Sequence, residues 1–90
     1  MRFRITPHAG HDAPADAVEQ LLATLSGRRS KGRFSKVGSE IRVVWGRDDG
    51  GWDRDLRREA EREELLELLR EACGPGGPLK LDWYAIGPLD

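Results

Sequence analysis

Six stretches with a recognisable residue period follow one another in only 90 residues, and their order constrains the fold more than any single motif does. Apolar residues at every second position indicate a half-buried strand, whereas apolar residues three and four apart indicate an amphipathic helix. In chain order the stretches predict a strand, a helix, two strands, a helix and a strand. A chain of this length forms one small domain, so all six elements have to share one thin core. We therefore predict a single α+β domain over residues 1–90.

The first strand and the first helix have the clearest patterns. Phe3 and Ile5 alternate with arginines, which predicts a strand with one buried side. In the segment that follows, Asp12 is a candidate helix N-cap and Pro14 suits a first helical turn. Gly27 is placed to end this helix. The apolar stripe of the helix consists of Ala15, Val18, Leu21, Leu22 and Leu25.

The rest of the chain supplies two strands, a helix and a final strand. We predict a short strand near residues 33–37, a turn at Gly38-Ser39, a strand over 41–45, a helix over 53–73 and a strand over 79–84. The glycine- and proline-rich run 74–78 stops the second helix. Residues 86–90 include a proline and are expected to form an irregular tail. This order predicts a ferredoxin-like βαββαβ sandwich, in which a four-stranded antiparallel sheet has both helices on one face.

The second helix has an apolar stripe only in its second half. The stripe consists of Leu65, Leu68, Leu69, Ala72 and Cys73. Continued toward the N-terminus, the same stripe falls on Arg57, Arg58, Glu61 and Arg62. A helix over 53–73 is about 31 Å long, whereas a six-residue strand spans about 20 Å. We therefore expect the charged half to extend beyond the sheet into water, or else to dock a partner.

The predicted sheet leaves one face without helices, and this face is the candidate binding surface. The helix side takes Phe3, Ile5, Ile41, Val43, Trp45, Leu79, Leu81 and Trp83. The open side takes Arg2, Arg4, Arg42, Val44, Lys80, Asp82 and Tyr84. The second strand adds either Phe34 and Lys36 or Arg33, Ser35 and Val37, because a slip of one residue exchanges its two sides. The open side is thus predicted to be cationic, with Val44 and Tyr84 at its apolar centre.

Charge is distributed unevenly along the chain. Residues 1–47 hold nine Lys/Arg and four Asp/Glu, whereas residues 48–90 hold six Lys/Arg and twelve Asp/Glu. A basic segment on the loop after the first helix and along the second, edge strand contains Arg28, Arg29, Lys31, Arg33 and Lys36. Separate surfaces of opposite charge favour binding to partners. Lys and Arg on an edge strand also have a simpler role, because they prevent edge-to-edge pairing of sheets.

Two functions from different classes fit these surfaces. The first is a non-catalytic protein–protein interaction module or small subunit, which binds a protein or a second copy through the open sheet face or a sheet edge. The alternative is a nucleic-acid-binding domain, which uses the same arginines and the basic segment to bind phosphates. Trp52 lies outside every apolar stripe, so it either packs on the sheet or is exposed as an interface anchor.

No residue pattern predicts catalysis or a cofactor. The chain has no glycine-rich phosphate loop, no nucleophile elbow and no Cys/His pair. His8, His11 and Asp12 are weak candidates for a metal site, because zinc needs three or four ligands and Asp12 is already assigned as a helix cap. We therefore expect no enzyme activity, no cofactor and no metal.

Composition restricts the cellular setting. Cys73 is the one cysteine, so no internal disulfide can form, which fits a reducing compartment. No apolar run approaches the length of a membrane span, and the first residues lack the apolar stretch of a signal peptide. Arginine outnumbers lysine by twelve to three, a bias typical of GC-rich bacterial genomes. We expect a bacterial, cytoplasmic protein that does not bind membranes.

Overall fold

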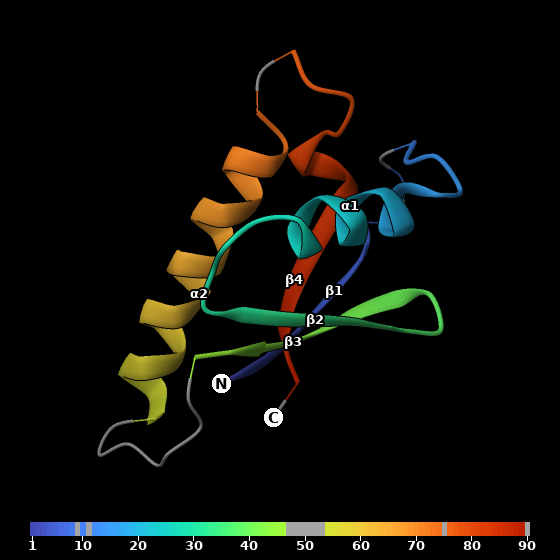
Figure 1. Cartoon of the computed structure of the whole chain (residues 1–90). Coiled ribbons are helices and arrows are strands. Elements are labelled where there is room, and N and C mark those ends of the chain that lie inside the picture. The colour runs from blue at the N-terminus through green and yellow to red at the C-terminus, as the bar shows by residue number, and fades with distance from the viewer. Residues whose placement is uncertain (9, 11, 47–53, 75, 90) are drawn as a thin grey trace.

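The computed structural model describes residues 1–8, 10, 12–46, 54–74 and 76–89. Its elements are β1 (Arg2–Pro7), α1 (Ala17–Ser26), β2 (Gly32–Val37), β3 (Glu40–Trp45), α2 (Arg54–Ala72), the 3-10 helix η1 (Leu81–Trp83) and β4 (Tyr84–Pro88). The strands form one sheet in the order β2-β3-β1-β4, with antiparallel neighbours throughout (Figure 1). The protein is therefore an α+β structure with an open four-stranded sheet and two helices, which is compatible with a ferredoxin-like arrangement.

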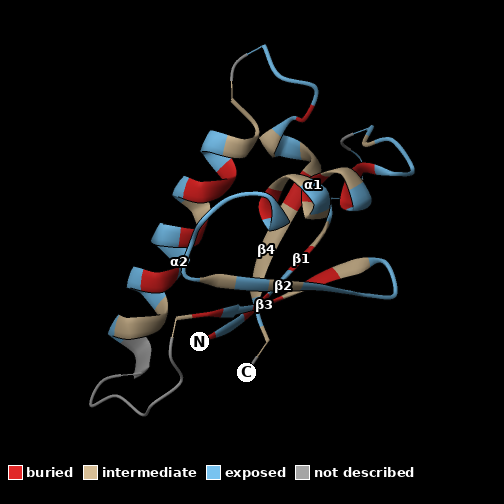
Figure 2. Ribbon diagram, in the orientation of Figure 1, coloured by how far each residue is buried: buried red, intermediate tan, exposed pale blue. Residues whose placement is uncertain are grey.

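The core lies between the sheet and the two helices. Every second residue of β1 and β3 is buried in it, namely Phe3, Ile5, Ile41, Val43 and Trp45. The helices contribute Val18, Leu21 and Leu25 from α1 and Leu65, Leu68 and Leu69 from α2. Figure 2 shows these buried positions as red bands along the helices. The predicted helical stripes are thus confirmed, except that Ala15 precedes α1 and is exposed and that Cys73, which packs against the core, follows the last residue of α2.

Helix α1 begins later than predicted. The assignment of Asp12 as its N-cap is wrong, because Asp12 lies in the left-handed region with φ of 53° and the helix begins at Ala17. Asp16 precedes the first helical residue, but its side chain makes no capping hydrogen bond. The amide of Ala17 donates to the carbonyl of Pro14 at 3.1 Å, which closes a turn before the helix. Gly27 ends the helix, as predicted.

The last strand also lies later than predicted. Residues 81–83 form a 3-10 helix instead of a strand, and β4 occupies Tyr84–Pro88. Ile86 of β4 is directly opposite Ile5 of β1. Residues 86–88, which we expected to belong to an irregular tail, therefore lie in an edge strand of the sheet. Pro88 is compatible with this position, because an edge strand tolerates a residue that lacks a backbone N–H.

The charged half of α2 contains a buried residue, contrary to the expectation that this half stands in water. Glu61 is only 9% exposed. Its carboxylate lies 3.1 Å from the Met1 ammonium and 3.4 Å from Arg57 Nε. The Met1 ammonium also donates to the carbonyl of Trp45 at 3.1 Å, which connects α2 to the ends of β1 and β3. A carboxylate is tolerated at this core position because two cations flank it.

Two of the tryptophans can be placed. Trp45 is buried, as predicted, whereas Trp83 is half-buried and packs edge-to-face on Tyr84 with ring centroids 6.4 Å apart. Trp52 lies outside the described residues. Among the helices of the described part, none combines the length and the apolar character that a membrane crossing requires.

Candidate functional site

The open face of the sheet consists of the strand residues that alternate with the core residues. They are Arg2, Arg4 and Thr6 of β1, Arg33, Ser35 and Val37 of β2, Glu40, Arg42 and Val44 of β3, and Ala85 and Gly87 of β4. The register of β2 decides between the two alternatives left by the sequence. Phe34 is opposite buried Val43 and packs against the core, so Arg33 is on the open face. The open face thus carries four arginines and one carboxylate among the described residues.

Strand pairing arranges the open face in rows across the sheet. In one row, Val44 lies between Arg33 of β2 and Arg2 of β1. In the next row, Arg4 is directly opposite Arg42. Residues two apart on a strand are separated by about 6.7 Å. The four arginines therefore occupy two adjacent rows and form one cationic patch.

The Arg4–Arg42 pair brings two like charges close together. Met1 and Trp45, three positions along the same ladder, exchange both backbone hydrogen bonds. Hydrogen-bonded and non-hydrogen-bonded pairs alternate along an antiparallel ladder, so the Arg4–Arg42 pair is of the non-hydrogen-bonded type. Side chains approach most closely in that type, with Cβ atoms about 4.5–5.5 Å apart. Like charges in this position destabilise a sheet.

Only part of the positive charge on the open face is compensated within the chain. Arg42 Nε lies 2.6 Å from Glu40 Oε2, and both residues are half-buried. Arg4 and Arg33 are exposed and form no ion pair with any residue that the structure describes. Val44, beside them, is 37% exposed. The open face is therefore an exposed cationic surface with a small apolar element.

Three residues predicted for the open face lie elsewhere, namely Tyr84, Lys80 and Asp82, the last of which lies in η1. The predicted exposure of Tyr84 is wrong, because β4 begins there with its side chain on the core side, and the hydroxyl donates to the carbonyl of Ala17 at 2.8 Å. Burial raises the pKa of Tyr84 to about 12. Lys80 precedes η1 in an extended backbone conformation and is exposed outside the sheet. The structure places Arg2, Arg4, Arg42 and Val44 on the open face.

The basic segment, which runs from the end of α1 into β2, is partly paired with acidic residues of both helices. The pairs are Lys31 Nζ with Glu64 Oε2 at 2.9 Å, Lys36 Nζ with Glu19 Oε1 at 2.5 Å, and Arg28 Nη1 with Glu71 Oε2 at 3.8 Å. The hydrogen bond from Lys36 lowers the pKa of Glu19, and the hydrogen bond to Glu64 raises the pKa of Lys31. Arg29 and Arg33 form no ion pair within the described structure. Three of the five cations therefore attach the segment to α1 and α2.

The candidate metal ligands are only partly described. His8 and Asp12 are exposed, and His11 lies outside the described residues. Within the described ranges, no three His, Cys, Asp or Glu side chains converge on one point. His8 is held by its backbone amide, which donates to the carbonyl of Trp83 at 2.8 Å.

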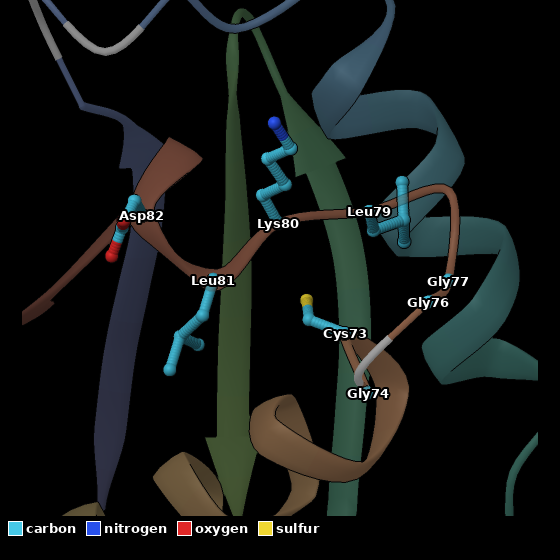
Figure 3. Close-up of a pocket in the computed structure, with 8 residues that line it drawn as sticks. All are labelled: Cys73, Gly74, Gly76, Gly77, Leu79, Lys80, Leu81 and Asp82. Atoms are coloured by element: carbon cyan, nitrogen blue, oxygen red, sulfur yellow. The ribbon is translucent and has the colours of Figure 1, made fainter.

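A shallow hollow that sequence reasoning missed lies where α2 meets the glycine-rich loop. It has a volume of about 450 Å³ and is lined by Cys73, Gly74, Gly76, Gly77, Leu79, Lys80, Leu81 and Asp82 (Figure 3). Burial raises the pKa of the Cys73 thiol, which keeps the sulfur protonated and weakly nucleophilic at neutral pH. Lys80 and Asp82 are exposed to solvent. The hollow thus offers a concave shape without an activated group.

Comparisons with known proteins identify no relative. No protein-family model, no curated protein and no solved structure matches the chain. The functional argument therefore rests on the arrangement of side chains on the open face.

Proposed function

We propose that the chain is a single-domain ferredoxin-like βαββαβ sandwich that serves as a non-catalytic interaction module and docks an acidic protein surface on its open face. The observation that carries this proposal is the Arg4–Arg42 pair, in which two guanidinium groups are directly opposite each other on the uncovered side of the sheet. Arg33 and Arg2 add two further cations in the adjacent row. Together they suit a partner that brings carboxylates.

The destabilising effect of the Arg4–Arg42 pair in the free protein supports a role in binding. Like charges directly opposite each other reduce sheet stability by up to about 1 kcal/mol. Glu40 offsets only the charge of Arg42. A carboxylate of a partner, placed between the two guanidinium groups, would replace their repulsion with charge-assisted hydrogen bonds. Natural proteins retain such local departures from stability mainly at functional sites.

The composition of the open face favours a partner of opposite charge over a second copy bound face to face. A two-fold contact places the same patch on both sides, so it would bring four arginines against four arginines. The exposed apolar residues on this face are Val37 and Val44, at 50% and 37% exposure. They form too small a patch to drive association against that repulsion.

Nucleic acid is the second candidate, because arginine side chains also bind phosphates in a forked geometry. Two observations make it the weaker candidate. The described open face carries no aromatic side chain for base stacking, since Phe34 packs on the core side and Tyr84 is buried. In addition, three cations of the basic segment are already paired with glutamates of α1 and α2.

We place the module in a bacterial cytoplasm on compositional grounds. A single cysteine suits a reducing compartment, and the excess of arginine over lysine suits a GC-rich bacterial genome.

Binding of two labelled probes tests the proposal. Fluorescence anisotropy would be measured with poly-L-glutamate and with single-stranded DNA, at low and at physiological ionic strength. We expect poly-L-glutamate to bind with an affinity that falls as salt is added. The double variant Arg4→Ala/Arg33→Ala should weaken this binding about tenfold, a loss of about 1.4 kcal/mol. The matched control Arg29→Ala/Lys80→Ala removes two exposed cations outside the open face and should leave the affinity unchanged.

Two outcomes would contradict the proposal. Tighter binding of DNA than of poly-L-glutamate through Arg4 and Arg33 would make nucleic acid the partner. Absence of binding to both probes at low ionic strength would remove the open face as a docking surface.

A further inference from the structure

The two edges of the sheet, β2 and β4, differ in how far they are closed to a further strand (Figure 1). In β4 and beside it, the backbone hydrogen bonds of Trp83 and Leu89 point to β1. This orientation alternates along a strand, so Tyr84, Ile86 and Pro88 direct their backbone groups outward. The N–H of Tyr84 already donates to a carbonyl of η1, and Pro88 has no N–H. Among the residues of β4, Ile86 alone therefore presents an outward N–H.

The orientation of the backbone in β2 follows from the bond that precedes this strand. The carbonyl of Lys31 accepts from the amide of Gly46 at 2.9 Å, so Lys31 directs its backbone groups toward the β3 side. By the same alternation, the next residue and every second one after it direct theirs away from β3. These outward-facing residues are Gly32, Phe34 and Lys36.

Most of the outward backbone groups of β2 remain available. The N–H of Gly32 donates to Ser30 Oγ at 3.2 Å. The N–H groups of Phe34 and Lys36, and the carbonyls of all three residues, have no hydrogen-bond partner among the residues that the structure describes. Four of the six residues of β2 are exposed. A row of unpaired backbone groups on an exposed edge is a template for the addition of a strand.

We infer that the acidic partner of the open face carries an extended segment, which adds to this edge as a fifth strand beside β2. The inference rests on the proposed function and specifies the conformation in which the partner binds. Backbone hydrogen bonds to Phe34 and Lys36 supply affinity, and alternate side chains of the segment supply specificity. An added strand lies about 4.8 Å from β2 and continues the open face by one strand.

The charge of the edge selects an acidic segment. In one row across the sheet, the added residue lies beside Arg33, which is followed by Val44 and Arg2. Arg33 is exposed and forms no ion pair with a described residue. The three glutamates that contact the basic segment do not repel an acidic strand strongly, because each is paired with one of its cations. A carboxylate opposite Arg33 would supply the ion pair that this side chain lacks in the described part of the chain.

The two sides of the added strand require different residues. Positions opposite Arg33 and Ser35 lie on the open side, and the short side chain of Ser35 leaves room for a second carboxylate there. The position opposite Phe34 lies on the helix side, where the half-buried ring packs against the core. An apolar residue suits this position. The segment therefore alternates acidic and apolar residues.

A second copy of β2 is a poorer occupant of the edge. The strand contains two cations, Arg33 and Lys36, and no carboxylate. Two copies would also bring together two basic segments, in each of which ion pairs with the helices compensate three of the five cations. The cations of the edge thus keep copies apart and admit an acidic strand.

Two backbone-methylated peptides of equal charge test the inference on the unaltered protein. The parent probe is the labelled peptide acetyl-Thr-Val-Glu-Val-Glu-Val-amide. Antiparallel to β2, it places its valines opposite Lys36, Phe34 and Gly32, and its glutamates opposite Ser35 and Arg33. Methylation of the first two valine nitrogens removes N–H groups that face β2, whereas methylation of the two glutamate nitrogens removes N–H groups that point away.

Fluorescence anisotropy at low ionic strength measures the binding of the three peptides. Methylation of the valines should weaken binding about tenfold or more, because two backbone hydrogen bonds are lost. The peptide methylated on the glutamates should bind like the parent. Arg33→Ala should weaken binding of the parent about fivefold, and the control Arg29→Ala should leave it unchanged.

Amide hydrogen exchange gives a second readout. Saturation with the parent peptide should slow exchange of the Phe34 and Lys36 amides, because they become hydrogen-bonded. Exchange of the Ile86 amide, on the opposite edge, should not change.

Absence of binding by the parent, equal binding of the two methylated peptides, or unchanged exchange of Phe34 and Lys36 overturns the inference. Poly-L-glutamate then separates the two claims. Binding of poly-L-glutamate that still depends on Arg4 and Arg33 would keep the proposed function, with a partner held by its side chains and not by its backbone. Loss of poly-L-glutamate binding as well would remove both.

Discussion

At the scale of single residues, Tyr84 determines which side chains of β4 border the cationic patch. Its side chain is 7% exposed, and its hydroxyl donates to the carbonyl of Ala17 at 2.8 Å. With Tyr84 on the core side, Ala85 and Gly87 are on the open face, and Gly87 is directly opposite Arg4. Because Gly87 has no side chain, the guanidinium group of Arg4 beside it stays accessible.

The substitution Tyr84→Phe should lower the free energy of unfolding by about 1 kcal/mol at neutral pH, because it removes one buried hydrogen bond. The effect should depend on pH. Burial raises the pKa of Tyr84 to about 12 in the folded protein, whereas the unfolded value is about 10. Between these values the folded chain retains a proton that the unfolded chain has lost, so wild-type stability is fully present below about pH 10 and falls toward pH 12.

Urea unfolding of the wild type and Tyr84→Phe from neutral pH to pH 12 measures this difference. The advantage of the wild type should shrink across the upper two units, because the variant lacks the titrating phenol. A constant difference over the whole range would contradict the assignment of the pKa shift to Tyr84.

At the scale of the elements, the period of the apolar residues locates a helix or a strand correctly where one side of that element is buried. The stripes of α1 and α2 and the alternation in β1 and β3 follow directly from burial, and the structure confirms them. The last strand was misplaced because residues 79–83 alternate as a strand would. The contact that fixes β4, from Tyr84 to Ala17, joins residues 67 positions apart, and no local pattern contains it.

The candidate site, too, could be predicted where it follows from burial but not where it depends on contacts between distant parts of the chain. Alternation alone predicts Arg2, Arg4, Arg42 and Val44 on the open side, where the structure places them. The opposition of Arg4 and Arg42 depends on the register between two strands, and a one-residue slip would abolish it. The pairing of the basic segment with glutamates depends on how the helices pack. Neither feature is visible in the order of residues.

Within α2, the buried carboxylate of Glu61 leads to a prediction. The substitution Glu61→Gln keeps the size of the side chain but removes the charge that pairs with the Met1 ammonium and Arg57. We expect the free energy of unfolding to fall by about 2 kcal/mol, because a cation is left poorly compensated in a buried position. Urea denaturation measures this loss. The exposed control Glu63→Gln should change stability by no more than about 0.5 kcal/mol; equal effects of the two substitutions would contradict a structural role of Glu61.

Within the sheet, Arg4→Thr should raise the free energy of unfolding by some tenths of a kcal/mol up to about 1 kcal/mol, because it removes a like-charge pair and introduces a good strand former. The gain should shrink at high ionic strength, where the repulsion is screened. The control Arg33→Thr lies opposite Val44, which has no charge, and should have a smaller effect. Thermal unfolding at two salt concentrations measures both variants. A loss of stability in Arg4→Thr would show that Arg4 is retained for the fold and not for a partner.

At the scale of the whole molecule, internal ion pairs divide the charges into two groups. One group forms ion pairs that attach β2, and the loop before it, to the two helices. Its members are Arg28, Lys31 and Lys36. Arg4 and Arg33 of the open face are exposed and form no ion pair with a residue that the structure describes. A protein with a net charge of −1 can therefore carry a cationic open face.

The central claim is that the open face, including Arg33, binds an acidic partner, and that the other side chains of the basic segment do not. An NMR titration that follows the arginine Nε–Hε signals during addition of poly-L-glutamate tests it most directly. We predict that the signals of Arg2, Arg4, Arg33 and Arg42 shift together along one saturable curve, while those of Arg28 and Arg29 stay in place. Shifts confined to Arg28 and Arg29, or no shift at low ionic strength, would contradict the claim.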